Sequence, residues 1–312
     1  MRSFYSYGKL LITGEYLVLD GALALSCPTK DGQSMVVESI PDADEPVLAW
    51  ISIDPDGVWF EGFFQQQDFQ PLKSSNEAVA QHLSHLLQEA RKLNANFLQD
   101  NSSYSVMTLL EFPRNWGLGS SSTLINNVAQ WADVDPIQLF FKWANGSGYD
   151  VAQATVESPI SYRVAEQRAN WDRVAFDPEF KDQLFFVYLN EKQNSTQQVQ
   201  GYQELRAQLE LHQLTGAVTD LTKRALAAQD LKSFEAVLTE HEQVLGQVLQ
   251  QTPVQQRLFS DYKAGVVKSL GAWGGDFVLV TGDVTTPTYF TDKGYTTVRS
   301  WSEMIFDPHA DE

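Results

Sequence analysis

The stretch "PRNWGLGSSST" at 113–123 constrains the fold more than any other feature of the sequence. The residues before it, "YSVMTLLEF" at 104–112, have the composition of a β-strand. The run after it predicts a helix that begins near Ser121. The apolar residues of that helix recur at helical spacing: Leu124, Ile125, Val128 and Trp131. A tight glycine turn that joins a strand to a helix requires a fold containing both kinds of element.

The rest of the chain also mixes strands and helices. A helix is expected from Ser75, with Ser74 or Ser75 as N-cap, and another from Pro136, with Asp135 as N-cap. Three long helical patterns are expected up to about Leu270. The expected strands lie between Gly, Pro and Asp turns, at 10–13, 22–26, 34–40, 47–53, 58–64, 183–189 and 277–282, and the last forty residues add a short helix and the strand "TTVRSW".

The composition limits the classes of partner. The chain has 40 acidic and 22 basic residues and a formal charge of −18, which repels nucleic acid and anionic membranes. A small anion can still bind where backbone N–H groups and one or two cations gather. The start of the sequence lacks the pattern of a secretory signal, and the single cysteine, Cys27, is expected to be a buried thiol in a reducing compartment. We therefore expect a cytoplasmic protein that binds neither nucleic acid nor membrane, as a monomer or homodimer.

Two interpretations of the glycine loop are open from its residues alone. Glycines allow close backbone approach, and a helix N-terminus attracts phosphate. The other interpretation is a tight turn in which a serine caps the helix. The loop is not a Walker loop, because the Gly-Lys-Ser/Thr order is absent and no lysine lies between Lys92 and Lys142.

Three segments in order resemble the signature motifs of the GHMP kinases, the superfamily of galactokinase, homoserine kinase, mevalonate kinase and phosphomevalonate kinase. They are "GKLLITGEYLVLDGALALS" at 8–26, "PRNWGLGSSST" at 113–123 and "GAWGGDFVLV" at 271–280. A further turn, "GSGYDVAQA" at 146–154, is similar to the turn that carries the catalytic aspartate in the mevalonate and phosphomevalonate kinase branch.

The resemblance implies an α+β protein with two domains and an active-site cleft between them. An N-terminal ATP-binding domain of the ribosomal protein S5 domain 2 type would span residues 1–170. A C-terminal ferredoxin-like domain would span residues 171–312. The activity implied is transfer of the γ-phosphoryl group of ATP to a hydroxyl or phosphate acceptor of mevalonate or phosphomevalonate type.

The resemblance also assigns roles to individual residues. Asp150 matches the aspartate beside the acceptor, as base or electrostatic orienter, although an aspartate at such a turn can also be an N-cap. Lys9 matches the lysine near Asp150 and the transferred phosphoryl group. Ser121 matches the hydroxyl that ligates Mg²⁺. The residues expected to hold ATP are Pro113, Gly117, Leu118, Gly119, Ser120, Ser121, Ser122, Gly274 and Gly275.

Other positions of the motifs are open. Glu15 and Tyr16 would line the acceptor pocket or order the turn, and Asp276 would be structural. Lys192, Ser195 and Thr196 follow a strand at a place where relatives contact the acceptor.

The sequence departs from the family pattern in two respects. The metal-binding glutamate of mevalonate kinases is absent, and the corresponding place near Leu139 is apolar. Trp116 and Trp273 stand where relatives have small residues; they would stack on adenine, narrow the entrance or pack between the domains, and packing is favoured. These departures leave a second hypothesis open, a catalytically weak or inactive relative that senses a nucleotide or metabolite. The acceptor is not readable from the sequence.

Overall fold

The structure is a computed structural model that describes residues 1–308 except residues 167, 192–194 and 274. It contains two compact units, each made of several chain segments. The first unit comprises Met1–Gly8, Asp31–Arg114 and Leu118–Val156. The second comprises Lys9–Lys30, Asn115–Gly117 and Glu157–Glu312. Because the units are not consecutive halves of the sequence, the domain boundary expected after residue 170 stays a prediction.

The first unit is built on a sheet whose strands are ordered β5-β4-β3-β6-β2, and β1 also pairs with β2. The β3–β6 pair is parallel, whereas the β2–β6, β3–β4 and β4–β5 pairs are antiparallel. Two of the expected strands, 22–26 and 34–40, belong to the single long strand β2. The strand bounds are β1 (Arg2–Thr13), β2 (Ala24–Ile40), β3 (Val47–Asp54), β4 (Gly57–Gln65), β5 (Pro71–Ser74) and β6 (Ser103–Leu110).

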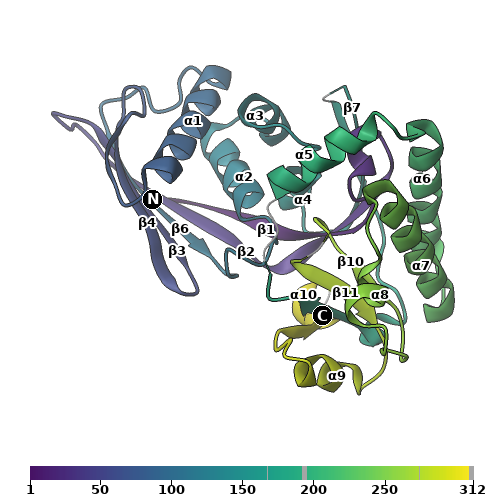
Figure 1. Cartoon of the computed structure of the whole chain (residues 1–312). Coiled ribbons are helices and arrows are strands. Elements are labelled where there is room, and N and C mark those ends of the chain that lie inside the picture. The colour runs from purple at the N-terminus through teal and green to yellow at the C-terminus, as the bar shows by residue number, and fades with distance from the viewer. Residues whose placement is uncertain (167, 192–194, 274, 309–312) are drawn as a thin grey trace. The chain divides into compact units, whose positions relative to one another are not determined.

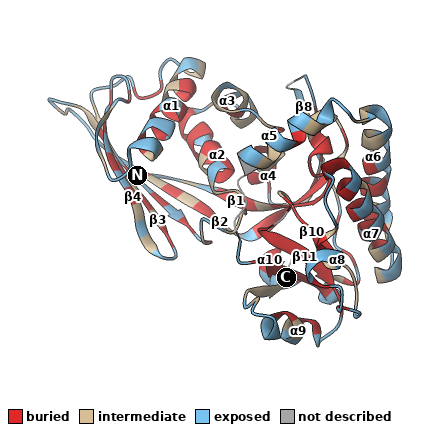
Figure 2. Cartoon of the chain, in the orientation of Figure 1, coloured by how far each residue is buried: buried red, intermediate tan, exposed pale blue. Residues whose placement is uncertain are grey.

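Helices cover one face of this sheet (Figure 1). Buried residues line the helix sides that face the sheet (Figure 2). Alternate strand residues such as Trp50, Phe60 and Val106 form the core with these helices. The helix bounds are α1 (Glu77–Leu93), α2 (Ser120–Ala132), α3 (Pro136–Trp143) and α4 (Tyr149–Ala154).

Two helix caps test the sequence predictions. The cap of α3 is confirmed, because the Asp135 carboxylate accepts a hydrogen bond from the Gln138 N–H at 2.7 Å. The cap predicted for α1 is wrong, because Asn76, and not Ser74 or Ser75, accepts from the Val79 N–H. The sheet explains the difference: Ser75 continues the pairing of β5, with its N–H donating to the Glu61 carbonyl and its hydroxyl accepting from the Glu61 N–H.

The second unit contains a four-stranded antiparallel sheet in the order β10-β11-β9-β12. A hairpin of β7 and β8 adds to the Ala24–Ser26 part of β2. Helices α6 and α7 pack side by side (Figure 1). The strand bounds are β7 (Ile160–Ala165), β8 (Arg168–Arg173), β9 (Leu184–Tyr188), β10 (Val267–Ser269), β11 (Phe277–Thr281) and β12 (Val298–Ser300).

The helices of the second unit follow the predicted patterns only in part. Three long helices are present, but the helical pattern expected up to Leu270 ends at Leu249. Pro253 interrupts it, and β10 follows Gly265, where a Cβ atom would lie 2.2 Å from the Thr281 carbonyl oxygen. Glycine thus permits the close approach of two backbones. The helical bounds are η1 (Leu17–Asp20), η2 (Lys181–Gln183), α5 (Ser195–Arg206), α6 (Leu211–Ala227), α7 (Leu231–Leu249), α8 (Val254–Leu258), α9 (Thr286–Asp292) and α10 (Trp301–Met304).

Two further observations concern the expected environment of the chain. Cys27 is buried, as predicted, and burial raises the pKa of its thiol. Among the described residues, no helix combines the length and the apolarity needed to cross a membrane.

Candidate functional site

The glycine loop leads directly into α2, and two of its glycines adopt left-handed backbone conformations. The φ angle is 69° at Gly117 and 94° at Gly119. Such angles are accessible to glycine and strained for other residues. Leu118, between the two glycines, is buried and anchors the loop.

The N-terminus of α2 has a glycine where helices usually have a capping side chain. Gly119 is the N-cap residue, and no side-chain hydrogen bond caps the helix in the part of the chain that the structure describes. The first N–H groups of a helix have no partner within the helix and carry a partial positive charge. The arrangement therefore presents backbone donors that a side-chain cap does not occupy.

The serines of the loop do not take over the capping role. The Ser122 hydroxyl is buried and donates to the Gly119 carbonyl at 2.8 Å, and Thr123 donates to the same carbonyl. Ser121 lies on the first turn of α2 and is exposed. No serine side chain among the described residues caps α2, so the geometry does not fit a serine-capped turn. It fits an anion site.

Buried polar contacts fix α2 within the first unit. Asn126 donates to the Ser6 hydroxyl and to the Ala154 carbonyl, both at 2.9 Å. Asn127 donates to the Gln33 carbonyl at 3.0 Å. The periodicity of the sequence predicted the apolar side of this helix but not these amide contacts, which join segments far apart in the chain.

Asp150 lies in the first turn of α4, a short helix that packs against α2. The N-cap is Gly148, with a φ of 78°, so Asp150 is not the N-cap residue. Its carboxylate is partly exposed and accepts a hydrogen bond from the Val151 N–H at 3.0 Å. Within the first unit, Ser121 and Asp150 therefore lie in the first turns of two helices that pack together.

Lys9 contacts the glycine loop within the second unit. Its ammonium group donates to the Gly117 carbonyl at 3.0 Å, and the residue is partly buried. The Tyr188 hydroxyl donates to the Asn115 carbonyl at 3.1 Å. Burial raises the pKa of Tyr188, as do the negative charges of Asp276 and Glu191, so its hydroxyl stays protonated and remains a donor.

Asp276 reaches the same glycine from the third signature segment. A Cβ atom at Gly117 would lie 2.6 Å from Oδ2 of Asp276, so the carboxylate occupies the place of a side chain. Asp276 is 8% exposed, and its N–H donates to the Glu191 carbonyl at 2.6 Å. The sequence suggested a structural role for Asp276 but not this contact. Of the predicted glycines, Gly275 is buried and Gly274 lies outside the described residues.

Trp116 and Trp273 both pack against side chains of the second unit; packing between the domains, the alternative favoured from the sequence, stays a prediction. The Trp116 ring lies edge-on to Phe277 with ring centres 5.5 Å apart, and the Arg299 guanidinium lies over it at 4.7 Å. Trp273 is 2% exposed in an apolar cluster with Tyr16. The contacts of Trp116 with Phe277, Tyr188 and Arg299 were not predicted, because the residues lie far apart in the sequence.

Solved structures share this architecture, although the sequences differ strongly. No protein-family model matches the sequence, and the search of curated proteins found no match. The structure of Streptococcus pneumoniae phosphomevalonate kinase in complex with phosphomevalonate and AMPPNP is similar, with a TM-score of 0.70 and 17% identity over 96% of this chain and 98% of that chain. The structure of L. major mevalonate kinase in complex with R-mevalonate has a TM-score of 0.67 and 15% identity, over 99% of this chain and 97% of that chain. Lactococcus lactis galactokinase with galactose also has a TM-score of 0.67, at 13% identity over 97% and 93%.

The chain has the GHMP kinase fold. The α+β class and the fold expected from the three signature segments are therefore confirmed. The residues of the site stay predictions, because a likeness at such low identity establishes the fold alone.

The sequence has no glutamate near Leu139, the place where the resemblance led us to expect a metal-binding glutamate. Leu139, which stands near that place, is buried in the core of the first unit. In the described part of the chain, no group of three or more His, Cys, Asp or Glu side chains is arranged to hold a metal ion.

Glu15 and Tyr16 of the first signature segment order the turn after β1. Glu15 is buried and pairs with Lys268, and the Tyr16 hydroxyl accepts a hydrogen bond from the backbone N–H of Trp273 at 3.2 Å. Lys192 lies outside the described residues, and the structure describes the backbone but not the side chains of Ser195 and Thr196.

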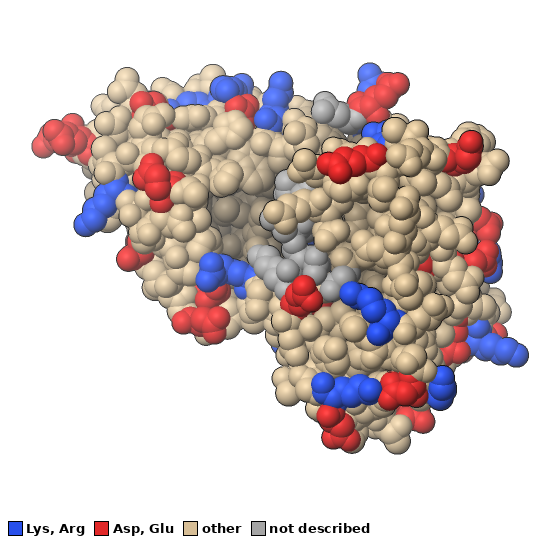
Figure 3. All heavy atoms as spheres, viewed as in Figure 1, with Lys and Arg blue, Asp and Glu red and all other residues tan. Residues whose placement is uncertain are grey.

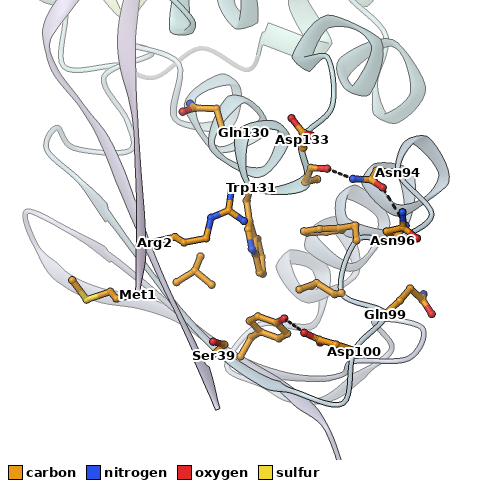
Figure 4. A pocket seen from close by; sticks show the side chains of 15 residues that line it. Met1, Arg2, Ser39, Asn94, Asn96, Gln99, Asp100, Gln130, Trp131 and Asp133 are labelled. Atoms are coloured by element: carbon orange, nitrogen blue, oxygen red, sulfur yellow. Dashed lines mark hydrogen bonds between the residues drawn. The ribbon is translucent and has the colours of Figure 1, made fainter. Parts of the chain in front are cut away.

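A pocket of about 530 Å³ in the first unit lies away from all predicted site residues. It lies at the C-terminal ends of α1 and α2, where Figure 4 shows Arg2 and Trp131 on one side and Asp100 on the other. Exposed amide side chains make up much of its wall. On the face that Figure 3 shows, acidic and basic side chains are interspersed.

Proposed function

We propose that this protein is an ATP-dependent small-molecule kinase of the GHMP type. It would transfer the γ-phosphoryl group of ATP to a hydroxyl or phosphate acceptor, and mevalonate or phosphomevalonate is the type of acceptor we favour. The observation that carries the proposal is the N-terminus of α2, where a left-handed glycine replaces a capping side chain. The fold supports it, because the similar structures include a phosphomevalonate kinase with AMPPNP and a mevalonate kinase with R-mevalonate.

The residues of the loop fit a triphosphate. The N–H groups at the start of α2 would bind the phosphates, and the left-handed conformations of Gly117 and Gly119 allow the backbone to approach them closely. Pro113, Leu118, Ser120 and Ser122 would support this cradle. Gly274 and Gly275 of the third signature segment belong to the same proposal.

Mg²⁺ would enter with the nucleotide and keep most of its ligands from phosphate and water. Such coordination is usual for Mg²⁺ and fits a site with few carboxylates. Ser121 is the protein ligand that we propose, because its hydroxyl lies in the first turn of α2 and is exposed. ATP with its metal supplies the activated phosphoryl group, and positioning and charge stabilisation are left to the protein.

Asp150 and Lys9 are the proposed catalytic residues. Asp150 would orient the acceptor and accept its proton, and its carboxylate has an exposed part that an acceptor can reach. Lys9 carries a fixed positive charge to the Gly117 carbonyl, where it would stabilise the charge that develops on the transferred group. A cytoplasmic location, where ATP is available, completes the proposal.

A second candidate function is a nucleotide or metabolite sensor with weak or no catalysis. The burial of Leu139 near the place expected for the metal-binding glutamate favours it. Retention of Lys9, Ser121 and Asp150 together favours the kinase, since a protein that only binds does not need a base.

The test combines nucleotide binding with phosphoryl transfer. Calorimetry with ATP and Mg²⁺ should show binding, and a panel of mevalonate, phosphomevalonate, homoserine and sugars should contain an acceptor that is phosphorylated. Asp150→Asn should remove turnover by about 1,000-fold or more while ATP affinity changes little. Asp133→Asn, an exposed aspartate at the other end of α2, is the matched control and should retain activity.

Two outcomes would contradict the kinase proposal. If millimolar ATP gives no binding, both the kinase and the nucleotide-sensing proposals fail. If ATP binds but the whole panel gives no turnover, the sensor is the better account.

A further inference from the structure

A fully buried ion pair in the second unit joins the first signature segment to the strand that precedes the third. The Lys268 ammonium lies 2.5 Å from Oε1 of Glu15, and both side chains are completely buried. Lys268 also donates to the Ser269 carbonyl at 2.8 Å. The two charged residues are far apart in the sequence and come from the turn after β1 and from β10.

Two residues of α7 complete this buried network. The Gly14 N–H donates to Nε2 of His241 at 3.1 Å, and the Ser269 N–H donates to Oε1 of Glu242 at 2.9 Å. Burial lowers the pKa of His241, and the charge of Lys268 lowers it further, so the ring stays neutral and can accept from Gly14. Helix α7 thus holds the backbone on both sides of the Glu15–Lys268 pair.

The burial of these groups is not explained by stability alone. Removing charges from water costs several kcal/mol per ion, and well-packed apolar residues often serve stability equally well. A buried pair instead imposes direction, because its partners must meet in one geometry. The question is which part of the molecule needs that geometry.

Both segments tied by the pair also contact the glycine loop at Gly117. Glu15 follows β1, the strand that carries Lys9, and Lys9 donates to the Gly117 carbonyl at 3.0 Å. Lys268 lies on β10, which precedes the loop that ends at Asp276, and Asp276 fills the side-chain position of Gly117. The ion pair therefore joins the same two segments whose residues Lys9 and Asp276 meet at Gly117.

A hydrogen bond also connects these two segments. The backbone N–H of Trp273 donates to the Tyr16 hydroxyl at 3.2 Å, so the third signature segment is also held to the first at the residue that follows Glu15. Gly14 has a φ of 98°, and a Cβ atom there would lie 2.5 Å from Cβ of Ala24. The turn at Gly14–Tyr16 is therefore closely packed, and a displacement at Glu15 has little room to be absorbed locally.

We propose that Glu15 and Lys268 are positioning residues, whose buried ion pair sets the placement of Lys9 and Asp276 at Gly117. The consequence for catalysis rests on the proposed kinase function, whereas the consequence for the loop's structure does not. The pair touches neither substrate nor phosphate in this account, and it acts through the two segments that contact Gly117.

Trp116, next to Gly117, provides a readout that does not depend on activity. Its ring packs on Phe277 and Tyr188, so a displaced loop changes its surroundings. The protein labelled with 5-fluorotryptophan gives a ¹⁹F resonance for Trp116 that Trp116→Phe assigns. The variants are Lys268→Met, Glu15→Gln and the double variant Glu15→Gln/Lys268→Met. Tyr262→Phe, which loses buried hydrogen bonds to Thr281 and Thr286 in the same unit, is the control for general destabilisation.

The expected result separates positioning from stability. The single variants should lower the thermal midpoint, and the double variant should recover most of it, because neither charge is then left unpaired. All three should shift or broaden the Trp116 resonance, and kcat at saturating ATP should fall about 10-fold or more. Tyr262→Phe should lower the midpoint without moving the resonance. If the single variants do not fold, the double variant still distinguishes a positioning role of the pair from a purely stabilising one.

A double variant with the wild-type Trp116 resonance and kcat would overturn the inference, since the pair would then serve stability alone. A parent protein without ATP binding would instead defeat the proposed function, and the resonance would still test the positioning role.

Discussion

Helices α2 and α3 are neighbours in the first unit, and their N-termini satisfy the same requirement in opposite ways. At α3, the Asp135 carboxylate accepts from the Gln138 N–H at 2.7 Å, and Pro136 at the first position has no N–H to satisfy. At α2, Gly119 offers no side chain. A helix start with a capping carboxylate satisfies one of its own N–H donors, whereas one without a capping side chain leaves these donors to water or to a ligand.

Helix α8 shows a third arrangement, in which the acceptor comes from another helix. Oε2 of Glu242, on α7, accepts from the Val254 N–H at 3.3 Å. Burial raises the pKa of Glu242 to about 7. The starts of α2 and α4 differ from both, because their N-cap residues, Gly119 and Gly148, are left-handed glycines without a side chain.

Among the variants that probe the helix starts, the largest effect is expected for Gly117→Ala. A Cβ atom there would lie 2.6 Å from Asp276 Oδ2, and the φ of 69° would strain it. Phosphoryl transfer should fall by about 100-fold or more, because the loop must move away from its place before α2. Gly294→Ala is the matched control, with a φ of 90° and open space around the new atom. Similar activity losses in both variants would show that backbone strain, not the loop, is responsible.

The carboxylate at α8 makes stability depend on pH. The pKa of Glu242 is about 7 in the folded protein against an ordinary 4.5. The contribution of the protonated side chain to the unfolding free energy is therefore fully present below about pH 4.5 and is lost as pH rises through 7. Glu242→Gln mimics the protonated form and does not titrate. Its unfolding free energy relative to wild type should therefore rise by about 2 to 3 kcal/mol as pH increases from 5 to 8. Denaturant titrations at both pH values measure this gain, and a difference independent of pH would refute the assignment.

A smaller effect on catalysis is expected for Ser121→Ala. The variant should lower kcat about 10-fold, because Mg²⁺ loses one oxygen ligand but keeps phosphate and water. Stability should not change, since Ser121 is exposed. Gln138→Ala, an exposed residue in the first turn of α3, should leave kcat unchanged. Equal kinetics for the Ser121 variant and wild type would remove Ser121 from the proposed site.

The smallest effect, about 1 kcal/mol, is expected for Asp135→Ala. Loss of the α3 cap should lower the unfolding free energy by this amount in denaturant titrations. The affinity for ATP should be unchanged, because the cap serves α3 alone. A weakened affinity for ATP would mean that the two helix starts are not independent.

The sequence predicted what neighbouring residues determine. Asp135 before Pro136 is a local signal, and it identified the cap of α3 correctly. The glycines at 117 and 119 likewise indicated a tight strand-to-helix turn, and the resemblance of three segments to the GHMP signature motifs indicated the fold.

Contacts between distant segments were not predictable in this way. Lys9 and Asp276 both meet Gly117, but neither periodicity nor composition relates residues so far apart. Lys268 stands within a predicted helical pattern that is in fact β10, so its burial against Glu15 left no signal. Even the cap of α1 was misplaced, because pairing at Ser75 extends the strand by one residue.

The most direct test of the proposed anion site at α2 is a titration of the ¹⁵N-labelled protein with Mg·ATP, followed by amide NMR. The account predicts shifts at Gly119, Ser120, Ser121 and Ser122, with the amides of Ile137 and Gln138 at the start of α3 unaffected. Saturable ATP binding that leaves the four α2 amides unchanged would contradict the account.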